Sequence, residues 1–505
     1  MVARLNTIAA AAWFKHLPVV LLGALYLFVI GLKAARTGLW FDEITTFYVA
    51  NSGDTVSIVK ALLARADNHP PIDYLARHYA MSLLGPSEFA FRLPSILAIL
   101  LASICLYLFV LRRFSVLPAL VAFAFPLTTF ALNYSVEGRP YALLLASACL
   151  ALLAWQLVTE KQSAPRLIFF TLCLSLGPHV HYYGVLNYLP LAAGEAWRWW
   201  EARRISWPVF GCFVVSLLIV ALLLPFVLNA AEFAVHFWTR IGPAMMLFIY
   251  GDLFSSSVSA VLAAAAGCAI LFVFFGEPAT PASEIPRFYG SEMIAALGFS
   301  FVPVTTYVLK VLVTQAYFDK YLITTVVGVA LIAAFLTAHL QAHRRSYGVV
   351  IALSLGLWAG WKLVYVGHYA PAKPYALSDQ VVKLVEKATL PIVVADAHRY
   401  SQIHYYLPPH LREKIIYVTD NKLALNYVGH DTNEIVLRNL QTVVNVRMAN
   451  LCEFTMRNSR LLILRERATW LERQLLKDGA DIKLVYDTGE RYEAVQVTMA
   501  RPSGC

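Results

Sequence analysis

The chain has 505 residues, of which 59% are hydrophobic and only 14% are charged. Ordinary soluble domains carry about 25% charged residues, so lipid must solvate much of this apolar surface, and a wholly soluble protein is excluded. The net charge of +10 does not indicate a nucleic-acid-binding protein, because the cations lie in short loops between apolar runs rather than on one face or tail.

Most of the chain before residue 370 consists of apolar runs long enough to cross a membrane, which takes about 17–25 residues. The first run is followed by no small-residue cleavage site, so we expect a membrane helix rather than a signal peptide. The stretch 167–197 is broken by a polar turn at 177–183 and is interpreted as two short spans, 167–180 and 183–197, which gives about eleven spans in all. The full-length runs are 17–35, 93–111, 116–134, 140–158, 207–229, 256–275, 292–313, 321–339 and 347–367.

The basic residues divide unevenly between the two sides of the membrane. With the N-terminus inside, the short outer loops hold Arg139, Arg240 and Lys320, and the first outer loop, 34–92, is long and polar. This is a strong positive-inside signal, and an odd number of spans then puts the C-terminus outside. The inner cations are Arg4, Lys15, Arg112, Arg113, Lys161, Arg166, Arg198, Arg203, Arg204, Arg287, Arg344 and Arg345.

From about residue 375 onward, charged residues are as frequent as in a soluble protein. This change in composition predicts a membrane domain at 1–370 and a soluble domain at 371–505. Residues 377–388 have a helical period, and buried-strand patterns follow it. This order predicts a small α/β domain, and the segment contains no Gly-rich phosphate loop. The three strand patterns are 391–396, 415–418 and 461–464.

Five of the seven cysteines lie in apolar runs, where a thiol is simply a small hydrophobic group. Cys452 and Cys505 lie in the soluble domain. They would pair if that domain faces an oxidising compartment, and two free thiols are the alternative.

The first polar motif is Trp-Phe-Asp-Glu at 40–43, directly after the first span. Two adjacent carboxylates at a membrane surface are costly unless they are solvated, paired or functional. Asp42 would serve as a general base toward an incoming hydroxyl. A solvated loop turn is an equally good interpretation of Asp42 and Glu43 from spacing alone.

The second motif, at 68–74, includes His69 and a Pro-Pro step that is typical of a helix start. Such a start presents backbone N–H groups to an anion. Arg92, at the outer end of the second span, would bind a phosphate or extend to the lipid headgroups, and a lone arginine favours the second interpretation.

The third motif, at 133–141, lies in a short outer turn and contains Glu137, Arg139 and Tyr141. Arg139 offers a fork for phosphate oxygens that Glu137 can orient, although the two side chains would also satisfy each other as a surface pair.

Two further outer turns are polar. His179 and His181 would ligate a metal only with more ligands than this motif holds, so polar lining of a cavity, or anchoring at the membrane interface, is the favoured interpretation. Lys320, in the segment 317–321, would bind a phosphate or a lipid headgroup. Every polar cluster falls on the same predicted side, as a reaction between a lipid-phosphate donor and an external acceptor would need.

The order of Trp-Phe-Asp-Glu, His-Pro-Pro, Arg-Leu-Pro-Ser and Tyr-Ser-x-Glu-x-Arg-x-Tyr resembles the GT-C superfamily of membrane glycosyltransferases. The closest resemblance is to bacterial relatives of protein O-mannosyltransferases and of lipid A aminoarabinose transferase. It covers about residues 15–370 and is most specific up to about Tyr183.

The resemblance implies a GT-C fold in the bacterial inner membrane, with the α/β domain in the periplasm. It also implies a polyprenyl-phosphate sugar donor and a glycan, lipid or protein acceptor. The family's catalytic acid maps onto Asp42, with Glu43 beside it, and Tyr141 and His181 are expected to line the substrate cavity. Its donor-site positions correspond to His69, Arg92, Glu137, Arg139 and Lys320, the last being more often arginine.

The implied mechanism is a single displacement that inverts the anomeric carbon. Asp42 would deprotonate or orient the acceptor, and Arg139, with Arg92 or Lys320, would stabilise the phosphate that leaves. Phosphate is already a good leaving group, so no general acid or cofactor is required. A divalent metal is optional, and no Asp/Glu-rich ligand set indicates one.

Two other classes of function fit parts of the pattern. A transporter or flippase of lipid-linked saccharides would have the same number of spans, but such proteins place ionisable groups near the midplane and often contain repeats, which this sequence does not indicate. A scaffold that recruits partners through its α/β tail is the third hypothesis. Deleting residues 374–505 would separate it from the enzyme.

Overall fold

The computed structural model describes residues 15–233, 244–275, 289–309, 317–368, 377, 379–487 and 492–503. Arg4, Arg240, Arg287 and Cys505, which entered the predictions above, lie outside these ranges. The chain forms two compact units. The helical unit comprises Met1–Ala35, His69–Val227 and Thr239–Ala370, and the α/β unit comprises Arg36–Asn68, Leu228–Trp238 and Pro371–Cys505.

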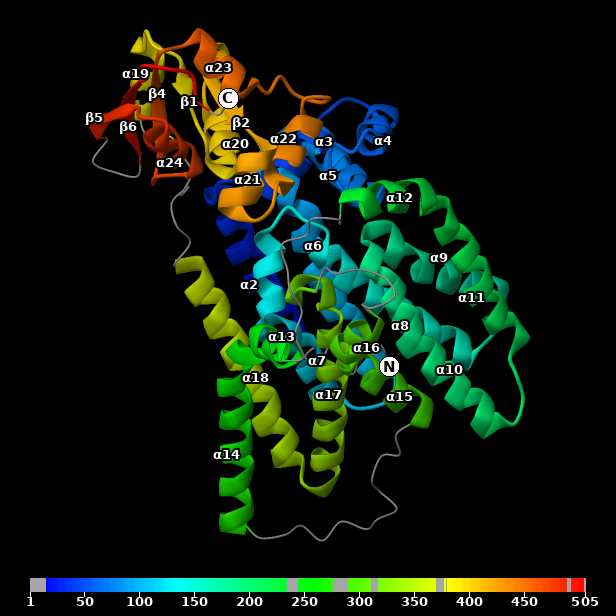
Figure 1. Ribbon diagram of the computed structural model, residues 1–505. Helices are drawn as coiled ribbons and strands as arrows, with labels where there is room; N and C mark the ends of the chain where they lie inside the picture. Colours follow the sequence, from blue (N-terminus) through cyan, green and yellow to red (C-terminus); the bar gives the residue numbers. More distant parts are fainter. Residues whose placement is uncertain are drawn as a thin grey trace. The chain divides into compact units, whose positions relative to one another are not determined.

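The helical unit is built from long apolar helices in which α6 packs on α7 and α8, α10 on α15, and α18 on α7 and α14 (Figure 1). The helices that lie wholly or partly in this unit are α2 (Leu17–Arg36), α5 (Pro71–Leu84), α6 (Glu88–Leu111), α7 (Val116–Thr128), η1 (Phe130–Val136), α8 (Tyr141–Glu160), α9 (Ala164–Val180), η2 (Tyr182–Asn187), α10 (Tyr188–Ala202), α11 (Trp207–Val220), η3 (Ala221–Leu223), α12 (Leu224–Phe233, which belongs to the α/β unit from Leu228), α13 (Met245–Phe254), η5 (Ser255–Ser257), α14 (Val258–Phe275), α15 (Gly290–Ser300), α16 (Val302–Leu309), η7 (Asp319–Leu322), α17 (Thr325–His343) and α18 (Arg345–His368).

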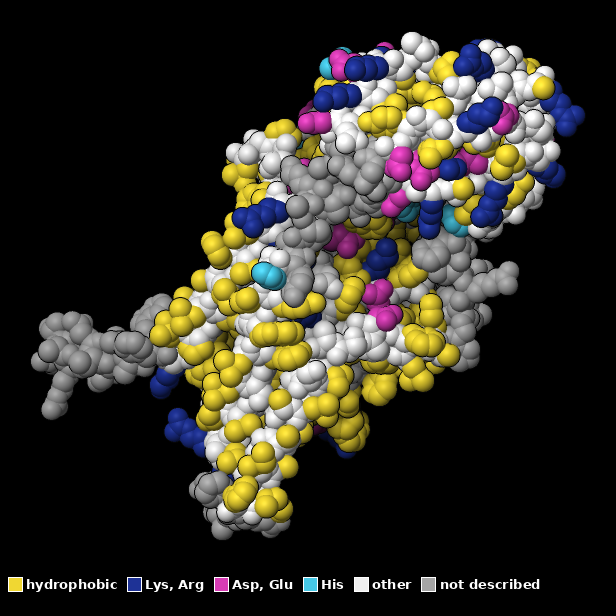
Figure 2. Space-filling model, turned by 90° about the vertical axis from the view of Figure 1, so that its left-hand side faces the viewer, with side chains coloured by type: hydrophobic (Ala, Val, Ile, Leu, Met, Phe, Trp, Pro, Cys, Tyr) yellow, Lys and Arg dark blue, Asp and Glu magenta, His cyan; other side chains and the backbone are white. Residues whose placement is uncertain are grey.

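Among the described residues, seven helices are long and apolar enough to cross a membrane, or nine if each of two bent pairs counts as one span. Their outer surfaces are apolar (Figure 2), with Leu218 in α11 66% exposed and Val273 in α14 76% exposed. Such surfaces are stable against lipid rather than water. The stretch 167–197 contains two helices, α9 and α10, separated by the turn η2. A many-span helical membrane protein is therefore confirmed, and the total of eleven stays a prediction.

Two predicted spans are bent rather than straight. α7 and η1 meet at 66°, and α15 and α16 meet at 59°. Pro126, near the end of α7, removes a backbone donor, which explains the first break. The carbonyls of Thr128 and Thr129 are then satisfied by the buried ammonium of Lys362 in α18, at 3.0 and 2.6 Å. A cation at the C-terminal end of a helix is stabilised by the helix dipole.

The α/β unit contains a six-stranded sheet in the order β3-β2-β1-β4-β6-β5. β1 pairs in parallel with β2 and β4, β2 pairs in parallel with β3, and β6 runs antiparallel between β4 and β5. The predicted α/β architecture is present, with three strands more than the pattern indicated. The strands are β1 (Ile392–Val393), β2 (Ile415–Thr419), β3 (Met448–Asn450), β4 (Arg460–Arg465), β5 (Asp481–Asp487) and β6 (Glu493–Thr498).

Helices cover both faces of this sheet (Figure 1). Alternate residues of one strand enter two separate cores: Ile415 and Tyr417 pack with helices α20 and α22, whereas Ile416 and Val418 pack with α23 and α24. This is the period of two that a strand buried on both faces requires. The helices of the α/β unit are α3 (Phe41–Ala50), α4 (Thr55–Leu63), α19 (Asp379–Lys387), α20 (Ala397–Tyr406), η8 (Pro409–Lys414), α21 (Asn421–Val428), α22 (Thr432–Leu440), α23 (Leu451–Arg457) and α24 (Trp470–Lys477).

The cysteines differ between the two units. Cys452 takes part in a disulfide, and the partner proposed for it, Cys505, lies outside the described residues. The five cysteines of the apolar helices are free thiols.

The stability of the α/β unit should fall in mild acid because of His404 in α20. This side chain is 2% exposed. Its Nδ1 lies 3.0 Å from the Tyr48 hydroxyl, and its Nε2 lies 3.2 Å from the Asn445 carbonyl oxygen. Burial, with a smaller contribution from Arg412, lowers the pKa of His404 from 6.5 to about 4. The unfolded chain therefore takes up a proton first, so stability is lost as the pH falls from about 6.5 toward 4, by about 2 kcal/mol at pH 5.

Hydrogen-exchange protection of residues 397–406, compared between pH 7 and pH 5, measures this loss. His404→Gln should flatten the pH dependence, whereas His410→Gln, at an exposed position of η8, should not. Equal pH dependence in all three proteins would contradict the assignment.

Candidate functional site

Helix α5 begins at the Pro-Pro step of the second motif. Pro71 occupies the first turn, where its missing N–H has no consequence. Asp73, in the same first turn, and Arg77, one turn further, form a buried ion pair, with 2.7 Å between Oδ1 and Nη2 and side chains no more than 1% exposed. Arg77 Nε donates to the other carboxylate oxygen at 3.0 Å, so the pair is bidentate.

The other donors of Arg77 bind segments that are remote in sequence. Nη1 donates to the Phe91 carbonyl in α6 at 2.9 Å, and Nη2 donates to the Arg139 carbonyl at 2.8 Å and to Ser95 Oγ at 3.1 Å. Ser95 in turn donates to the Glu137 carbonyl at 2.7 Å. Buried carbonyls need such partners, so this network fixes the turn before α8 against α5 and α6.

Gly138, inside that turn, allows the close approach. A Cβ at this position would lie 1.9 Å from Cε1 of Phe91, which is itself fully buried. Any side chain would therefore displace the turn and the adjacent Arg139.

Five of the predicted site residues meet in one cluster, which we call the cationic-aromatic cluster: His69, Arg139, Tyr141, His181 and Lys320. Arg139 Nη2 lies 3.1 Å from His69 Nδ1. The His69 ring lies 5.2 Å from that of His181 and 6.5 Å from that of Tyr141. Lys320 Nζ lies 5.2 Å from the centre of the Tyr141 ring, within range of a cation–π contact.

More aromatic rings complete the wall of the cluster. Tyr321 lies 4.9 Å from His181 and 5.0 Å from Tyr183, and Lys320 Nζ lies 5.6 Å from the Phe318 ring. The cations of such a cluster can hold a phosphate group. The aromatic rings beside them can stack against the face of a sugar.

His181 lies in the turn between α9 and α10 and is 3% exposed. Burial lowers its pKa well below the ordinary value, and the nearby His69, Arg139 and Lys320 lower it further. The imidazole is therefore neutral at pH 7. Its Nδ1 accepts from the Tyr183 N–H at 3.2 Å, which leaves Nε2 as the protonated nitrogen.

Two other predicted residues, Arg92 and Glu137, also contact backbone in the helical unit. Arg92 is 1% exposed, and its Nη1 donates to the Ala34 carbonyl of α2 at 3.1 Å. Glu137 is partly buried and contributes its backbone carbonyl to Ser95. The geometry therefore assigns both residues a contact that fixes backbone.

The two acidic residues of the first motif lie in α3, in the α/β unit. Glu43 is 1% exposed, and its Oε2 accepts from the Trp40 N–H at 3.3 Å, so it caps the helix. Asp42 is only partly buried. Both carboxylates occupy the first turn, where the helix dipole stabilises negative charge.

Helix α3 is held by α20 of the same unit. Phe41 stacks on His398 with 4.5 Å between ring centres and 1° between their planes. Tyr48 bonds to His404, and the Leu39 N–H donates to the Tyr406 hydroxyl at 2.7 Å. The helix that carries Asp42 is thus built onto the C-terminal α/β fold.

Among the described residues, no group of three or more His, Cys, Asp or Glu side chains is arranged to hold a metal.

Several residues of the site were not singled out from the sequence. Arg77 and Asp73 look like an ordinary helix-surface pair at a spacing of four. Tyr321 lies in the predicted segment 317–321 but was given no role of its own. Asp319 accepts from the Tyr134 hydroxyl at 2.9 Å. The sequence signal that could have identified this pair is a carboxylate followed one turn later by an arginine, directly after a Pro-Pro helix start.

Asp73→Asn should destabilise the helical unit, because Arg77 would keep a buried charge without a counter-ion, at a cost of about 3–5 kcal/mol. Thermal unfolding of the detergent-solubilised protein should show a lower Tm, and hydrogen exchange should rise at residues 137–139. Asp481→Asn is the control, since that carboxylate belongs to an exposed pair. An unchanged Tm for Asp73→Asn would contradict the role of the pair.

Gly184→Ala should displace the turn that carries His181. The new Cβ would lie 2.1 Å from the Gly177 carbonyl carbon. Because this is a backbone atom, the clash can be relieved only by moving the chain. His181, protected in the native protein, should then be carbethoxylated by diethyl pyrocarbonate, as measured by peptide mass spectrometry. Gly211→Ala is the matched control, because nothing lies within 4 Å of its Cβ position. Equal protection of His181 in both variants would refute this account of the turn.

Comparison with known proteins agrees with the resemblance seen in the sequence. Residues 68–228 match the family model of dolichyl-phosphate-mannose-protein mannosyltransferase, whereas no curated protein matches the chain. The crystal structure of ArnT from Cupriavidus metallidurans in the apo state superposes on this chain with a TM-score of 0.53. The two sequences are 15% identical, and the match covers 97% of this chain and 98% of that chain. The structure of the same protein bound to undecaprenyl phosphate is 15% identical, with a TM-score of 0.52, over 95% and 97%. Residues 68–228 thus match the model of the dolichyl-phosphate-mannose-protein mannosyltransferase family, and the chain has the fold of ArnT over nearly its whole length.

Proposed function

We propose that this protein is a glycosyltransferase that moves a sugar from a polyprenyl-phosphate donor to an acceptor on the periplasmic side of the bacterial inner membrane. The observation that carries the proposal is the cationic-aromatic cluster. It places Arg139, His69 and Lys320 together within the helical unit, and His69 and Arg139 lie inside the segment that matches the mannosyltransferase family. Binding of undecaprenyl phosphate by ArnT, which has the same fold, supports a lipid phosphate as the leaving group.

The residues suit distinct steps of a single inverting displacement. Arg139 and Lys320 bind the donor phosphate and stabilise the charge that it gains on leaving. Neutral His181 donates a hydrogen bond, and Tyr141 and Tyr321 line the site. Asp42 accepts the proton of the acceptor hydroxyl or amine, because it is the partly exposed carboxylate of the pair. Glu43 keeps the helix of Asp42 capped.

The side of the membrane is supported by two independent observations. Cations concentrate in the predicted inner loops. Cys452 of the α/β unit takes part in a disulfide, a bond that persists in oxidising compartments such as the periplasm. The acceptor is a lipid, a polysaccharide or a protein that reaches this side.

Substitutions can distinguish the two proposed roles, phosphate binding by Arg139 and proton acceptance by Asp42. Arg139→Ala should weaken binding of undecaprenyl phosphate roughly ten- to a hundredfold, since a hydrogen bond to a charged group contributes about 1.5–3 kcal/mol. Asp42→Asn should bind the lipid normally and abolish sugar transfer. Native mass spectrometry measures the binding, and release of labelled sugar from the polyprenyl phosphate into membrane glycoconjugates measures the transfer.

Arg112→Ala is the control for Arg139→Ala, because Arg112 is an exposed cation beyond the other end of α6, where it pairs with Glu160. Full transfer by Asp42→Asn would refute the role of Asp42. Lipid binding that is unchanged in Arg139→Ala would refute the donor site.

A further inference from the structure

The sheet of the α/β unit has a point where its strand order reverses. From β1 the chain proceeds outward through β2 and β3, and it then returns to place β4 on the other side of β1. β1, β2 and β4 are parallel, so their carboxyl ends share one edge of the sheet. In open α/β sheets, ligands bind in the crevice outside the carboxyl ends at such a switch point.

Two adjoining cavities, of about 350 and 240 Å³, lie at this edge. Both are lined by Asp396 after β1, by Asn433 of α22 and by Arg467 after β4. The larger is also lined by Arg473 of α24, and the smaller by His398 of α20. The larger volume suits a small ligand rather than a macromolecule.

The acidic residues of this switch-point crevice are engaged within the protein. Asp396 accepts from the Arg399 N–H at 2.9 Å and caps α20. Glu434 accepts from the Tyr417 hydroxyl at 3.0 Å, and Glu466 pairs with the Arg399 guanidinium.

Two arginines of the crevice differ from these acids. Within the part of the chain that the structure describes, Arg467 and Arg473 make no ion pair or hydrogen bond through their side chains. Both are exposed at the mouth of the larger cavity. Two guanidinium forks in one crevice are suited to the oxygens of an anionic group.

The remaining lining excludes a dinucleotide and favours a sugar. No glycine lies between β1 and α20 or between β4 and α24, so the backbone cannot wrap a pyrophosphate. The first turn of α24 is already capped by Glu472, which accepts from the Thr469 N–H at 2.6 Å. Tyr427 and Asn433, both only partly buried, offer instead the aromatic ring and amide with which proteins contact sugars.

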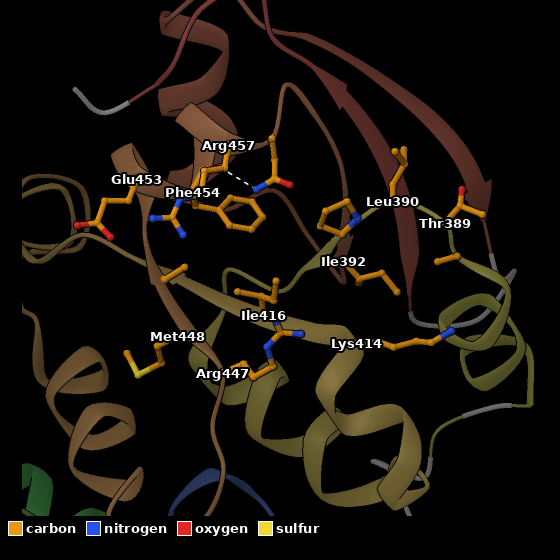
Figure 3. A pocket seen from close by; sticks show the side chains of 14 residues that line it. Thr389, Leu390, Ile392, Lys414, Ile416, Arg447, Met448, Glu453, Phe454 and Arg457 are labelled. Carbon is orange, nitrogen blue, oxygen red and sulfur yellow. Dashed lines mark hydrogen bonds between the residues drawn. The ribbon is translucent and has the colours of Figure 1, made fainter.

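A third cavity, of about 500 Å³, lies at the opposite edge, where β1 and β2 begin (Figure 3). Its cations Lys414 and Arg447 donate to the backbone carbonyls of Glu386 and Glu413. Because it lies at the amino ends of the strands, it serves as the comparison site. Its exposed Arg457, labelled in Figure 3, is a matched partner for substitution.

We propose that the switch-point crevice binds an anionic saccharide, whose charged group is held by Arg467 and Arg473. This site lies within the α/β unit and does not depend on the transfer reaction proposed above.

Calorimetric titration of the full-length protein in detergent with glucose 1-phosphate tests the proposal, with glucose and inorganic phosphate as separate probes. The sugar phosphate should bind at least tenfold more tightly than either fragment. Arg467→Ala and Arg473→Ala should each weaken its binding about tenfold or more. Arg457→Ala, in the comparison cavity, and Arg139→Ala, in the helical unit, should leave the affinity within about twofold.

Several outcomes would overturn the proposal. These are no binding of glucose 1-phosphate, equal affinity for inorganic phosphate, or loss of binding in Arg457→Ala but not in Arg467→Ala. A loss confined to Arg139→Ala would show that the probe reports the cationic-aromatic cluster, which would contradict this proposal while agreeing with the donor site.

Discussion

The buried ion pair between Asp73 and Arg77 is the interaction on which the geometry of the helical unit's site depends. One guanidinium joins a carboxylate of α5 to carbonyls of α6 and of the turn before α8. A charge buried in an apolar protein is stable only when all its donors are engaged, so the pair admits few alternative arrangements. Arg139 can therefore meet His69 because its own backbone is fixed by Arg77, and Gly138 lets that backbone lie against Phe91.

The sequence pointed to five residues that meet in the cationic-aromatic cluster, but not to the contacts that hold them, and Asp42, Glu43, Arg92 and Glu137 were predicted with them but lie elsewhere. Polar residues beside apolar runs are costly near a membrane and therefore indicate a functional site. This signal identified His69, Arg139, Tyr141, His181 and Lys320. The supporting residues carry no such signal, since the spacing of Asp73 and Arg77 is equally typical of a solvent-exposed helix. Arg92 shows the same limit: a lone arginine at a span end predicts a headgroup contact, whereas its side chain is buried on the Ala34 carbonyl.

Parts of the fold that depend on tertiary pairing were also out of reach. β1, β2 and β4 were visible as apolar runs, but β5 is exposed along nearly its whole length and has no clear alternation. It is a strand because β6 pairs with it. The attachment of α3 to α20 was likewise invisible, because it joins residues more than three hundred positions apart, such as Phe41 and His398. His398 also lines the switch-point crevice. The same imidazole therefore contacts both Phe41, in the helix of Asp42, and the proposed saccharide site.

We propose that the cationic-aromatic cluster binds the phosphate of the lipid donor. A cryo-electron microscopy structure of the full-length protein with undecaprenyl phosphate measures this directly. We expect phosphate density within hydrogen-bonding distance of the Arg139 guanidinium and the Lys320 ammonium, with His69 and His181 beside it. Density for the lipid phosphate elsewhere, with Arg139 still on His69 and no ligand at Lys320, would contradict the account.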